Sequence, residues 1–172
     1  ITHRPDMWGH RGFAREIAAI LQLPLKPLKN FLVPAEVESY DYQSPAHDTH
    51  KPWMFAIENE SNCSRFAAQH IARVDYKPSL LWMAHRLARV DARAIDAIVD
   101  TTNYVMFDIG QPMHAFDADK LADNRLIVRH AQQGEALHVL DGQTIQLKTE
   151  DIVVTDGANP VALAGIMGGL YT

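Results

Sequence analysis

The stretch Ala136-Leu-His-Val-Leu-Asp-Gly-Gln-Thr-Ile-Gln-Leu147 contains a strong signal for local structure. Two apolar runs, 136–140 and 144–147, are separated by Asp141-Gly142. Asp-Gly between two such runs is typical of a hairpin, because glycine adopts the positive φ angles that tight hairpin turns require. The stretch therefore predicts two antiparallel strands joined by a short turn.

Further strands are expected on both sides of this hairpin. Their apolar and β-branched residues predict strands at 126–130, 151–155 and 161–166, and Trp53 to Glu58 predicts an earlier one. The segment 65–74 fits either a strand or a helix, and Ile71 and Val74 favour a strand. The second half of the chain is therefore expected to be rich in β structure.

Helices are expected mainly in the first part of the chain. Apolar residues at helical spacing predict one helix from Pro5-Asp6 to Leu23, another from Pro78 to Val90, and a third over 93–107 that Gly110 and Pro112 end. Five prolines between Pro24 and Pro52 predict a loop-rich connection. Together these elements predict an α+β fold, with helices first and an antiparallel or mixed β-rich part second.

Composition and charge limit the classes of function. The 172 residues are 47% hydrophobic and 22% charged, which is typical of a folded globular chain. A formal net charge of -5 predicts no strong overall attraction to a phosphate backbone. The single cysteine, Cys63, excludes an internal disulfide, and no apolar run approaches the length of a membrane span. We therefore expect a soluble, cytoplasmic protein with no membrane partner.

Two groups of polar residues stand among apolar neighbours in the region 99–117. Thr101, Thr102 and Asn103 can donate and accept hydrogen bonds to a polar ligand, or can equally cap or brace the local backbone. His114 follows Pro112 closely, and its imidazole can move a proton near neutral pH or can simply brace a turn. The residue types alone leave both alternatives open.

Other candidate sites rest on weaker patterns. Ala164-Gly165 and Gly168-Gly169 end an apolar strand, where the backbone could approach a ligand closely or form a tight turn. His47 and His50 have metal-ligand spacing, and His114 with Asp117 and Asp119 could form a second metal cluster. The sequence contains neither a G-x-S-x-G elbow nor a phosphate-loop motif. We expect no bound metal in this chain.

Several motifs resemble one known family. They include Ile95-Asp-Ala-Ile-Val-Asp-Thr-Thr-Asn-Tyr-Val105, Gly110-Gln-Pro-Met-His-Ala-Phe-Asp117 and Ala164-Gly-Ile-Met-Gly-Gly169, with Leu81-Trp-Met83 and the early His3-Arg-Pro-Asp6 in support. This combination resembles the B3/B4 editing region of the phenylalanyl-tRNA synthetase β subunit, which usually has Asn at the position of His3. The resemblance implies two intimately packed sub-lobes. We expect 1–50 to be a leading helix and connection, and 51–172 to be the editing region, truncated at its C-terminal end.

The resemblance also implies an activity. In that family the B3/B4 region hydrolyses tyrosine that has been wrongly attached to phenylalanine tRNA. Carried over by motif, Thr102 and Asn103 would contact the aminoacyl-adenosine end, His114 would orient water or the ester, and Ala164 and Gly165 would line the amino-acid pocket.

The resemblance names partners and cofactors as well. The partners would be the 3′ aminoacyl end of phenylalanine tRNA and, through a full-length β chain, the α subunit of an (αβ)2 synthetase. ATP and Mg²⁺ would serve the whole synthetase, and this chain would need no cofactor. The family's editing site also uses a Glu shortly beyond the Gly-Gly pair, where this sequence stops. A noncatalytic, RNA-positioning role and a metal-dependent hydrolase using His47 and His50 are therefore alternatives.

Overall fold

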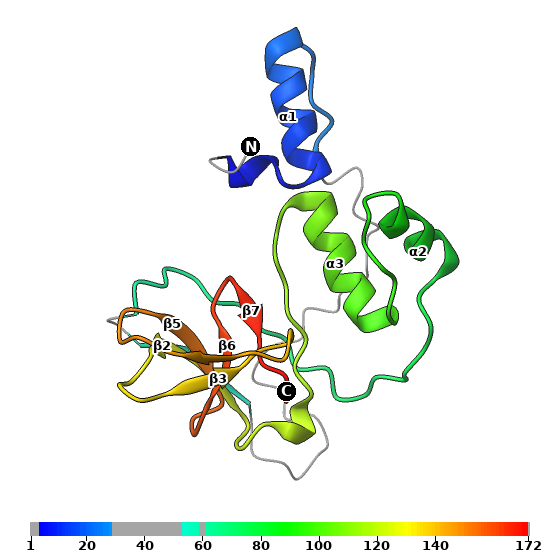
Figure 1. Cartoon of the computed structure of the whole chain (residues 1–172). Coiled ribbons are helices and arrows are strands. Elements are labelled where there is room, and N and C mark those ends of the chain that lie inside the picture. Colours follow the sequence, from blue (N-terminus) through cyan, green and yellow to red (C-terminus); the bar gives the residue numbers. More distant parts are fainter. Residues whose placement is uncertain (1–3, 29–52, 59–60, 172) are drawn as a thin grey trace. The chain divides into compact units, whose positions relative to one another are not determined.

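A computed structural model describes residues 4–28, 53–58 and 61–171. The chain forms two compact units, each built from two separate segments. The helical unit comprises 1–48 and 75–115, and the sheet unit comprises 49–74 and 116–172. Each unit is described by itself below (Figure 1). The division into 1–50 and 51–172 that we expect from the sequence stays a prediction.

The described part of the helical unit contains three α-helices. They are α1 (His10–Leu21), α2 (Leu81–Ala88) and α3 (Ala97–Ile109), and a 3-10 turn, η1 (Pro5–Met7), precedes α1. The three predicted helices are confirmed, with later starts than expected. The first begins at His10 because the chain from Pro5 forms a separate turn, and the third begins at Ala97 because Asp96 caps it.

A close contact between helix ends holds α1 against α3. A Cβ atom added to Gly9, the residue that caps α1, would lie 2.4 Å from the amide nitrogen of Gly110, which ends α3. His10 completes the contact, because its Nδ1 lies 2.8 Å from the carbonyl oxygen of Phe107. Only a residue without a side chain fits at position 9, and the backbones of the two helix ends can therefore touch.

In the described residues of the sheet unit, five strands form one mixed sheet in the order β1-β2-β5-β6-β7, and Figure 1 labels β2, β5, β6 and β7. Its strands are β1 (Met54–Ile57), β2 (Arg125–His130), β5 (Ile152–Thr155), β6 (Pro160–Leu163) and β7 (Met167–Gly168). Strand β1 runs parallel to β2, and the other neighbours are antiparallel. Two parallel neighbouring strands require a long crossover connection. The connection from β1 to β2 contains the segment 75–115 of the helical unit.

The predicted hairpin is confirmed as β3 (Ala136–His138) paired antiparallel with β4 (Thr144–Gln146). Gly142 has a φ of 85°, and the Asp141 carboxylate accepts a hydrogen bond from the Gln143 amide at 2.9 Å. The hairpin joins the edge of the large sheet through an antiparallel bridge between Val139 and Gly169. The turn residues therefore define the hairpin, and tertiary contacts define its place.

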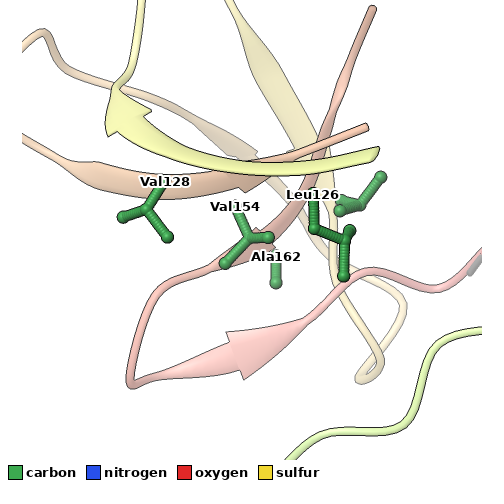
Figure 2. Packing of buried hydrophobic residues seen from close by; sticks show 5 residues of the cluster. Leu126, Val128, Val154 and Ala162 are labelled. Carbon is green, nitrogen blue, oxygen red and sulfur yellow. The ribbon is translucent and has the colours of Figure 1, made fainter. Parts of the chain in front are cut away.

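The core of the sheet unit consists of two clusters of apolar side chains. One contains Leu126, Val128, Val154, Val161 and Ala162, of which Figure 2 labels four, and the other contains Ala131, Leu137, Val139, Leu147 and Val153. Val153 and Val154 are neighbours in β5 but belong to different clusters, because successive residues of a strand point to opposite faces. Both faces of the sheet are therefore covered around β5.

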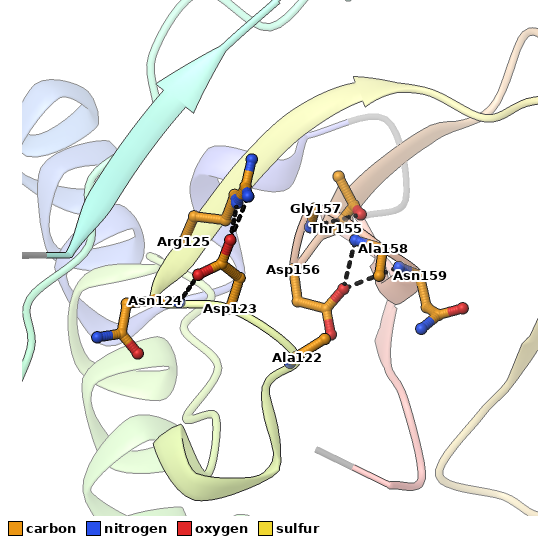
Figure 3. A network of polar contacts seen from close by, with 9 residues as sticks. All are labelled: Ala122, Asp123, Asn124, Arg125, Thr155, Asp156, Gly157, Ala158 and Asn159. Atoms are coloured by element: carbon orange, nitrogen blue, oxygen red, sulfur yellow. Dashed lines mark hydrogen bonds and ion pairs between the residues drawn. The ribbon is translucent and has the colours of Figure 1, made fainter. Parts of the chain in front are cut away.

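A buried carboxylate organises the turn between β5 and β6. Asp156 is 4% exposed and accepts hydrogen bonds from the amides of Ala122, Ala158 and Asn159 at 2.8–2.9 Å (Figure 3). Burial raises the pKa of Asp156, but these amide hydrogen bonds outweigh burial and hold the pKa below its usual value. The charged carboxylate of Asp156 thus holds the backbone at Ala122 against the turn between β5 and β6.

One expectation from the sequence is wrong, and one strand was missed. The segment 65–74 forms no strand, although Phe66 and Ala68 pack against the first apolar cluster. Strand β7 was not expected, because Met167-Gly168 is too short and too glycine-rich to show a pattern. Among the described residues, no helix is long and apolar enough to cross a membrane.

An ion pair supports the loop that follows β2. The Arg129 guanidinium donates to both carboxylate oxygens of Glu135, at 3.0 and 2.6 Å, and the side chains are only 10% and 17% exposed. Glu135 also accepts a hydrogen bond from the Gln132 amide at 2.7 Å. Hydrogen bonding to Arg129 holds the pKa of Glu135 below its usual value, although burial opposes this shift.

We predict that Glu135→Gln lowers the free energy of unfolding by about 2 kcal/mol at pH 7, because Arg129 loses its charged partner. The folded-state pKa of Glu135 is depressed, so its contribution is present above the unfolded pKa near 4.5 and is lost as pH falls through the folded pKa. Urea denaturation of the variant and the parent protein at pH 7 and pH 3 measures the difference in their free energies of unfolding. Glu150→Gln, an exposed control, should change little; an equal loss in both variants would contradict the prediction.

Candidate functional site

Two carboxylates define the start of α3, the helix that carries three candidate residues. Asp96 caps the helix, and its Oδ1 accepts hydrogen bonds from the amides of Ile98 and Val99 at 2.8 and 2.9 Å. Asp100 is fully buried, and its Oδ1 accepts from the Ile95 amide at 2.9 Å. No hydrogen-bond partner for the Asp100 Oδ2 is found in the described part of the chain. These hydrogen bonds fix where α3 begins, and they therefore fix which way the side chains after Asp100 point.

The two threonine hydroxyls bond back to the helix. Thr101 Oγ1 donates to the Ala97 carbonyl at 2.6 Å, and Thr102 Oγ1 donates to the Val99 carbonyl at 2.7 Å. This is the local bracing role that the sequence left open. A hydroxyl that has used its proton keeps its lone pairs, so Thr102 can still accept a hydrogen bond from a ligand.

Asn103 differs from the two threonines. Its side chain is half-buried in the middle of α3, and no hydrogen bond of its amide group is found among the described residues. An amide group offers both donors and acceptors, and these groups remain available to a ligand. Asn103 is therefore the candidate residue of α3 whose polar atoms have no structural use.

His114 lies in the extended segment after α3, beyond Gly110 and Pro112. Its side chain keeps much of its surface exposed, yet the surrounding protein lowers the pKa of His114 below its usual value. Partial burial produces this shift, because it disfavours the charged imidazolium. The imidazole is therefore mostly neutral at pH 7, which is the form that can accept a proton.

Ala164 and Gly165 belong to the sheet unit, in the turn between β6 and β7. Ala164 packs against the first apolar cluster, and its amide donates to the Ile152 carbonyl at 2.9 Å. Gly165 is exposed with a φ of 70°, and a Cβ atom placed there would meet nothing within 4 Å. Thr102, Asn103 and His114 thus belong to one unit and this turn to the other.

The Gly-Gly pair has a structural use. The Gly169 amide donates to the Val161 carbonyl at 2.8 Å, and the Gly168 carbonyl accepts from the Leu140 amide at 3.2 Å. A Cβ atom at Gly169 would lie 2.6 Å from the Val161 carbonyl oxygen. The pair therefore forms a sheet edge instead of the tight turn considered from the sequence.

The metal hypotheses have little support in the described residues. Asp117 caps a 3-10 helix, η3 (Ala118–Lys120), by accepting from the Asp119 amide at 3.2 Å. No group of three or more His, Cys, Asp or Glu side chains that could hold a metal occurs within residues 4–28, 53–58 and 61–171. His47 and His50 lie outside the described residues.

A cavity of about 390 Å³ in the helical unit was not predicted from the sequence. Arg86, Arg89 and Tyr104 are among the residues that line it, and Trp82 stands beside Arg86 and Tyr104. Trp82, Arg86 and Arg89 are spaced by four and three residues, which places them on one face of a helix. That spacing is the signal that could have identified the cavity.

Comparisons with known proteins bear on the whole chain. Residues 62–172 match the model of the B3/4 domain family. The β subunit of phenylalanine–tRNA ligase from Solibacter usitatus is 41% identical over 170 residues, which cover 98% of this chain and 20% of the relative. The chain belongs to the phenylalanine–tRNA ligase β subunit family.

Other family members show similar agreement. The β subunit from Oleidesulfovibrio alaskensis is 39% identical over 99% of this chain, and the one from Streptococcus pyogenes is 40% identical over 99%. In both cases the match covers 20% of the relative. The chain thus spans about one fifth of the length of these phenylalanine–tRNA ligase β subunits.

Two glycine substitutions test the contrast between the turn and the sheet edge. We predict that Gly165→Ala costs about 1 kcal/mol of stability, because the new methyl group has room and only the positive φ is strained. Gly169→Ala should cost about 3 kcal/mol, because its methyl group would overlap the Val161 carbonyl. Thermal unfolding of both variants measures the difference. Equal losses would contradict the assignment of Gly169 to a close backbone contact.

Proposed function

We propose that this chain is an editing domain that hydrolyses the ester between tyrosine and phenylalanine tRNA. The proposal rests on membership of the phenylalanine–tRNA ligase β subunit family and on the match to the B3/4 domain. The observation that carries it is Asn103, a half-buried amide group with no hydrogen bond among the described residues. A half-buried polar group that no protein atom pairs is available to a ligand.

Each candidate residue has a role in this proposal. Asn103 would hold the aminoacyl-adenosine end, and Thr102 would accept a hydrogen bond there because its own proton is already used. Ala164 and Gly165 would line the amino-acid pocket, where the exposed turn leaves space for a side chain. Metal ions need have no part in these roles.

The chemistry would be simple ester hydrolysis. A water molecule would attack the ester carbonyl carbon, and neutral His114 would accept or orient its proton. The bond to the ribose oxygen would then break, and that oxygen would leave with a proton. The products would be free tyrosine and uncharged tRNA.

A need for such a site follows from the limits of binding selectivity. A pocket built for phenylalanine rejects tyrosine incompletely, because the two differ by one hydroxyl group. An editing site can reverse the preference by hydrogen-bonding the phenol, which leaves its own polar groups unpaired when phenylalanine enters. The proposed substrate is therefore the tyrosyl ester.

The longer protein would be a phenylalanine–tRNA ligase. Its relatives are named as β subunits of that enzyme, so we infer an α-subunit partner in an (αβ)2 assembly, a tRNA substrate and a place in the cytoplasm. ATP and Mg²⁺ would serve the ligation reaction. No step of the ester hydrolysis proposed here passes through ATP or Mg²⁺.

A noncatalytic role in positioning RNA is the second candidate. It is favoured by the hydroxyls of Thr101 and Thr102, which already bond to helix carbonyls. Under this alternative the chain would be stable but would show no affinity for tyrosine. Equilibrium dialysis with labelled tyrosine distinguishes the two functions.

We predict that the chain hydrolyses phenylalanine tRNA that carries tyrosine faster than the same tRNA that carries phenylalanine. The measurement compares deacylation rates of both preformed substrates by this chain and by a full-length β subunit in complex with its α subunit. Selective hydrolysis by either protein, unchanged by a metal chelator, supports the proposal. If neither discriminates, the editing function is wrong; if chelation abolishes the activity, a metal-dependent hydrolase replaces it.

We predict that His114→Ala leaves the fold intact and lowers the rate of Tyr-tRNA hydrolysis at least tenfold, as expected for loss of a general base. In the parent protein the rate should be constant above pH 7, where His114 is neutral. It should fall to half of that plateau at a pH below 6.5, because the pKa of His114 is lowered from that value. Thr101→Val serves as a control that should retain activity. An unchanged rate in His114→Ala would remove this residue from the mechanism.

A further inference from the structure

The cavity between α2 and α3 combines positive charge with aromatic rings. Its lining consists of His10, Arg86, Leu87, Arg89, Val90, Tyr104, Phe107 and Asp108, all of which belong to the helical unit. The volume of about 390 Å³ lies within the range of small-ligand pockets. The cavity is therefore large enough for one flat ring and its charged substituent.

Arg86 is held in a fixed place by its aromatic neighbours. Its guanidinium carbon lies 5.4 Å from the centroid of the Trp82 ring, and its Nη1 donates to the Tyr104 hydroxyl at 2.6 Å. Trp82 and Tyr104 meet edge to face, with their centroids 5.2 Å apart. The guanidinium has five N–H donors, so this single bond to Tyr104 leaves others for an anion.

The charges of the lining favour an anionic ligand. Two guanidinium groups, Arg86 and Arg89, face a single carboxylate, Asp108, whereas the whole chain carries a formal net charge of -5. The cavity is thus a local exception on an acidic chain. Trp82 remains 49% exposed beside it and offers ring surface for stacking.

We propose that this cavity and the adjoining Trp82 bind a nucleotide of single-stranded RNA, with its phosphate held in the cavity by Arg86 and Arg89 and its base stacked on the exposed part of the Trp82 ring beside the cavity. Arginine donors for the phosphate and aromatic rings for the base are the combination that single-stranded nucleic acids require. The planar guanidinium matches phosphate oxygens through paired hydrogen bonds. The relatives are named as tRNA ligases, which agrees with an RNA ligand.

This RNA contact uses other residues than the ester-hydrolysing site proposed above. Tyr104 follows Thr102 by two residues, which is a rotation of about 200° around the axis of α3. The cavity therefore lies opposite Thr102 on that helix, and it adjoins Asn103, which precedes the lining residue Phe107 by about one helical turn. RNA binding here can be measured without any aminoacyl ester, so its failure would not be confused with failure of hydrolysis.

The first experiment measures binding of a fluorescein-labelled single-stranded RNA 12-mer to the whole chain by anisotropy. We expect Arg89→Gln and Arg86→Gln to weaken binding at least fivefold. Each should also reduce the slope of log affinity against log salt by about 0.7, as for the loss of one phosphate contact. Arg93→Gln is the matched control, because Arg93 is an exposed arginine of the same unit outside the cavity lining.

The control decides whether the cavity is specific. A change of less than twofold in Arg93→Gln, with circular dichroism unchanged in all variants, supports the proposal. An equal loss in Arg89→Gln and Arg93→Gln would mean general electrostatic attraction and would overturn it. If Arg86→Gln is unfolded, Arg89→Gln alone carries the test, because Arg89 lies at the end of α2 and has no aromatic contact with Trp82 or Tyr104.

The second experiment tests base stacking and distinguishes the sources of the phosphate. Trp82 is one of three tryptophans, so a chain with Trp8→Phe and Trp53→Phe reports on Trp82 fluorescence alone. We expect quenching by the RNA 12-mer and none by an abasic strand or by inorganic phosphate. Quenching by AMP at the same concentration as the RNA would identify a free-nucleotide site, and displacement of RNA by equimolar phosphate would identify a simple anion site. Either outcome would overturn the proposal.

Discussion

The pair of carboxylates at the start of α3 is the constraint on which the candidate site depends. Asp96 binds two amides of the first turn, and the buried Asp100 reaches back to the amide of Ile95. The Ala97 amide also donates to the Lys77 carbonyl at 3.0 Å, which ties the helix start to the segment before α2. Because these bonds define where α3 begins, they also define which way each later side chain faces.

Helix α3 consequently carries two kinds of chemistry. Thr102 and Asn103 lie about 100° apart around the helix and offer a hydroxyl that can only accept further hydrogen bonds and an amide group that can do both. Tyr104, Phe107 and Asp108 line the cavity with Arg86, and Asn103 lies next to Phe107 on the helix surface. Among the described residues of this unit, the buried apolar side chains are Met83 and Leu87 of α2.

The sheet unit solves its packing differently. Strand β5 contributes Val153 to one apolar cluster and Val154 to the other, so a single strand joins two cores. Gly169 and Gly168 then bring the sheet edge close to the hairpin of β3 and β4. The turn at Gly165 lies next to this edge, and a Cβ atom placed there would meet nothing within 4 Å.

Local patterns in the sequence were enough to predict the three helices, the hairpin at Asp141-Gly142 and the α+β class, because periodicity and turn residues act over a few neighbouring positions. They failed for 65–74, where Phe66 and Ala68 pack against strands far along the chain, and for β7, a two-residue strand that depends on its pairing with β6 and on the hydrogen bond from Leu140 to Gly168. The sequence by itself determined which polar residues were available as candidates. Only the structure decided that the hydroxyl protons of Thr101 and Thr102 are already used, because the folded helix brings each hydroxyl to a carbonyl one turn earlier. Only the tertiary structure decided that Arg86 meets both Trp82 and Tyr104, because Tyr104 belongs to a separate helix.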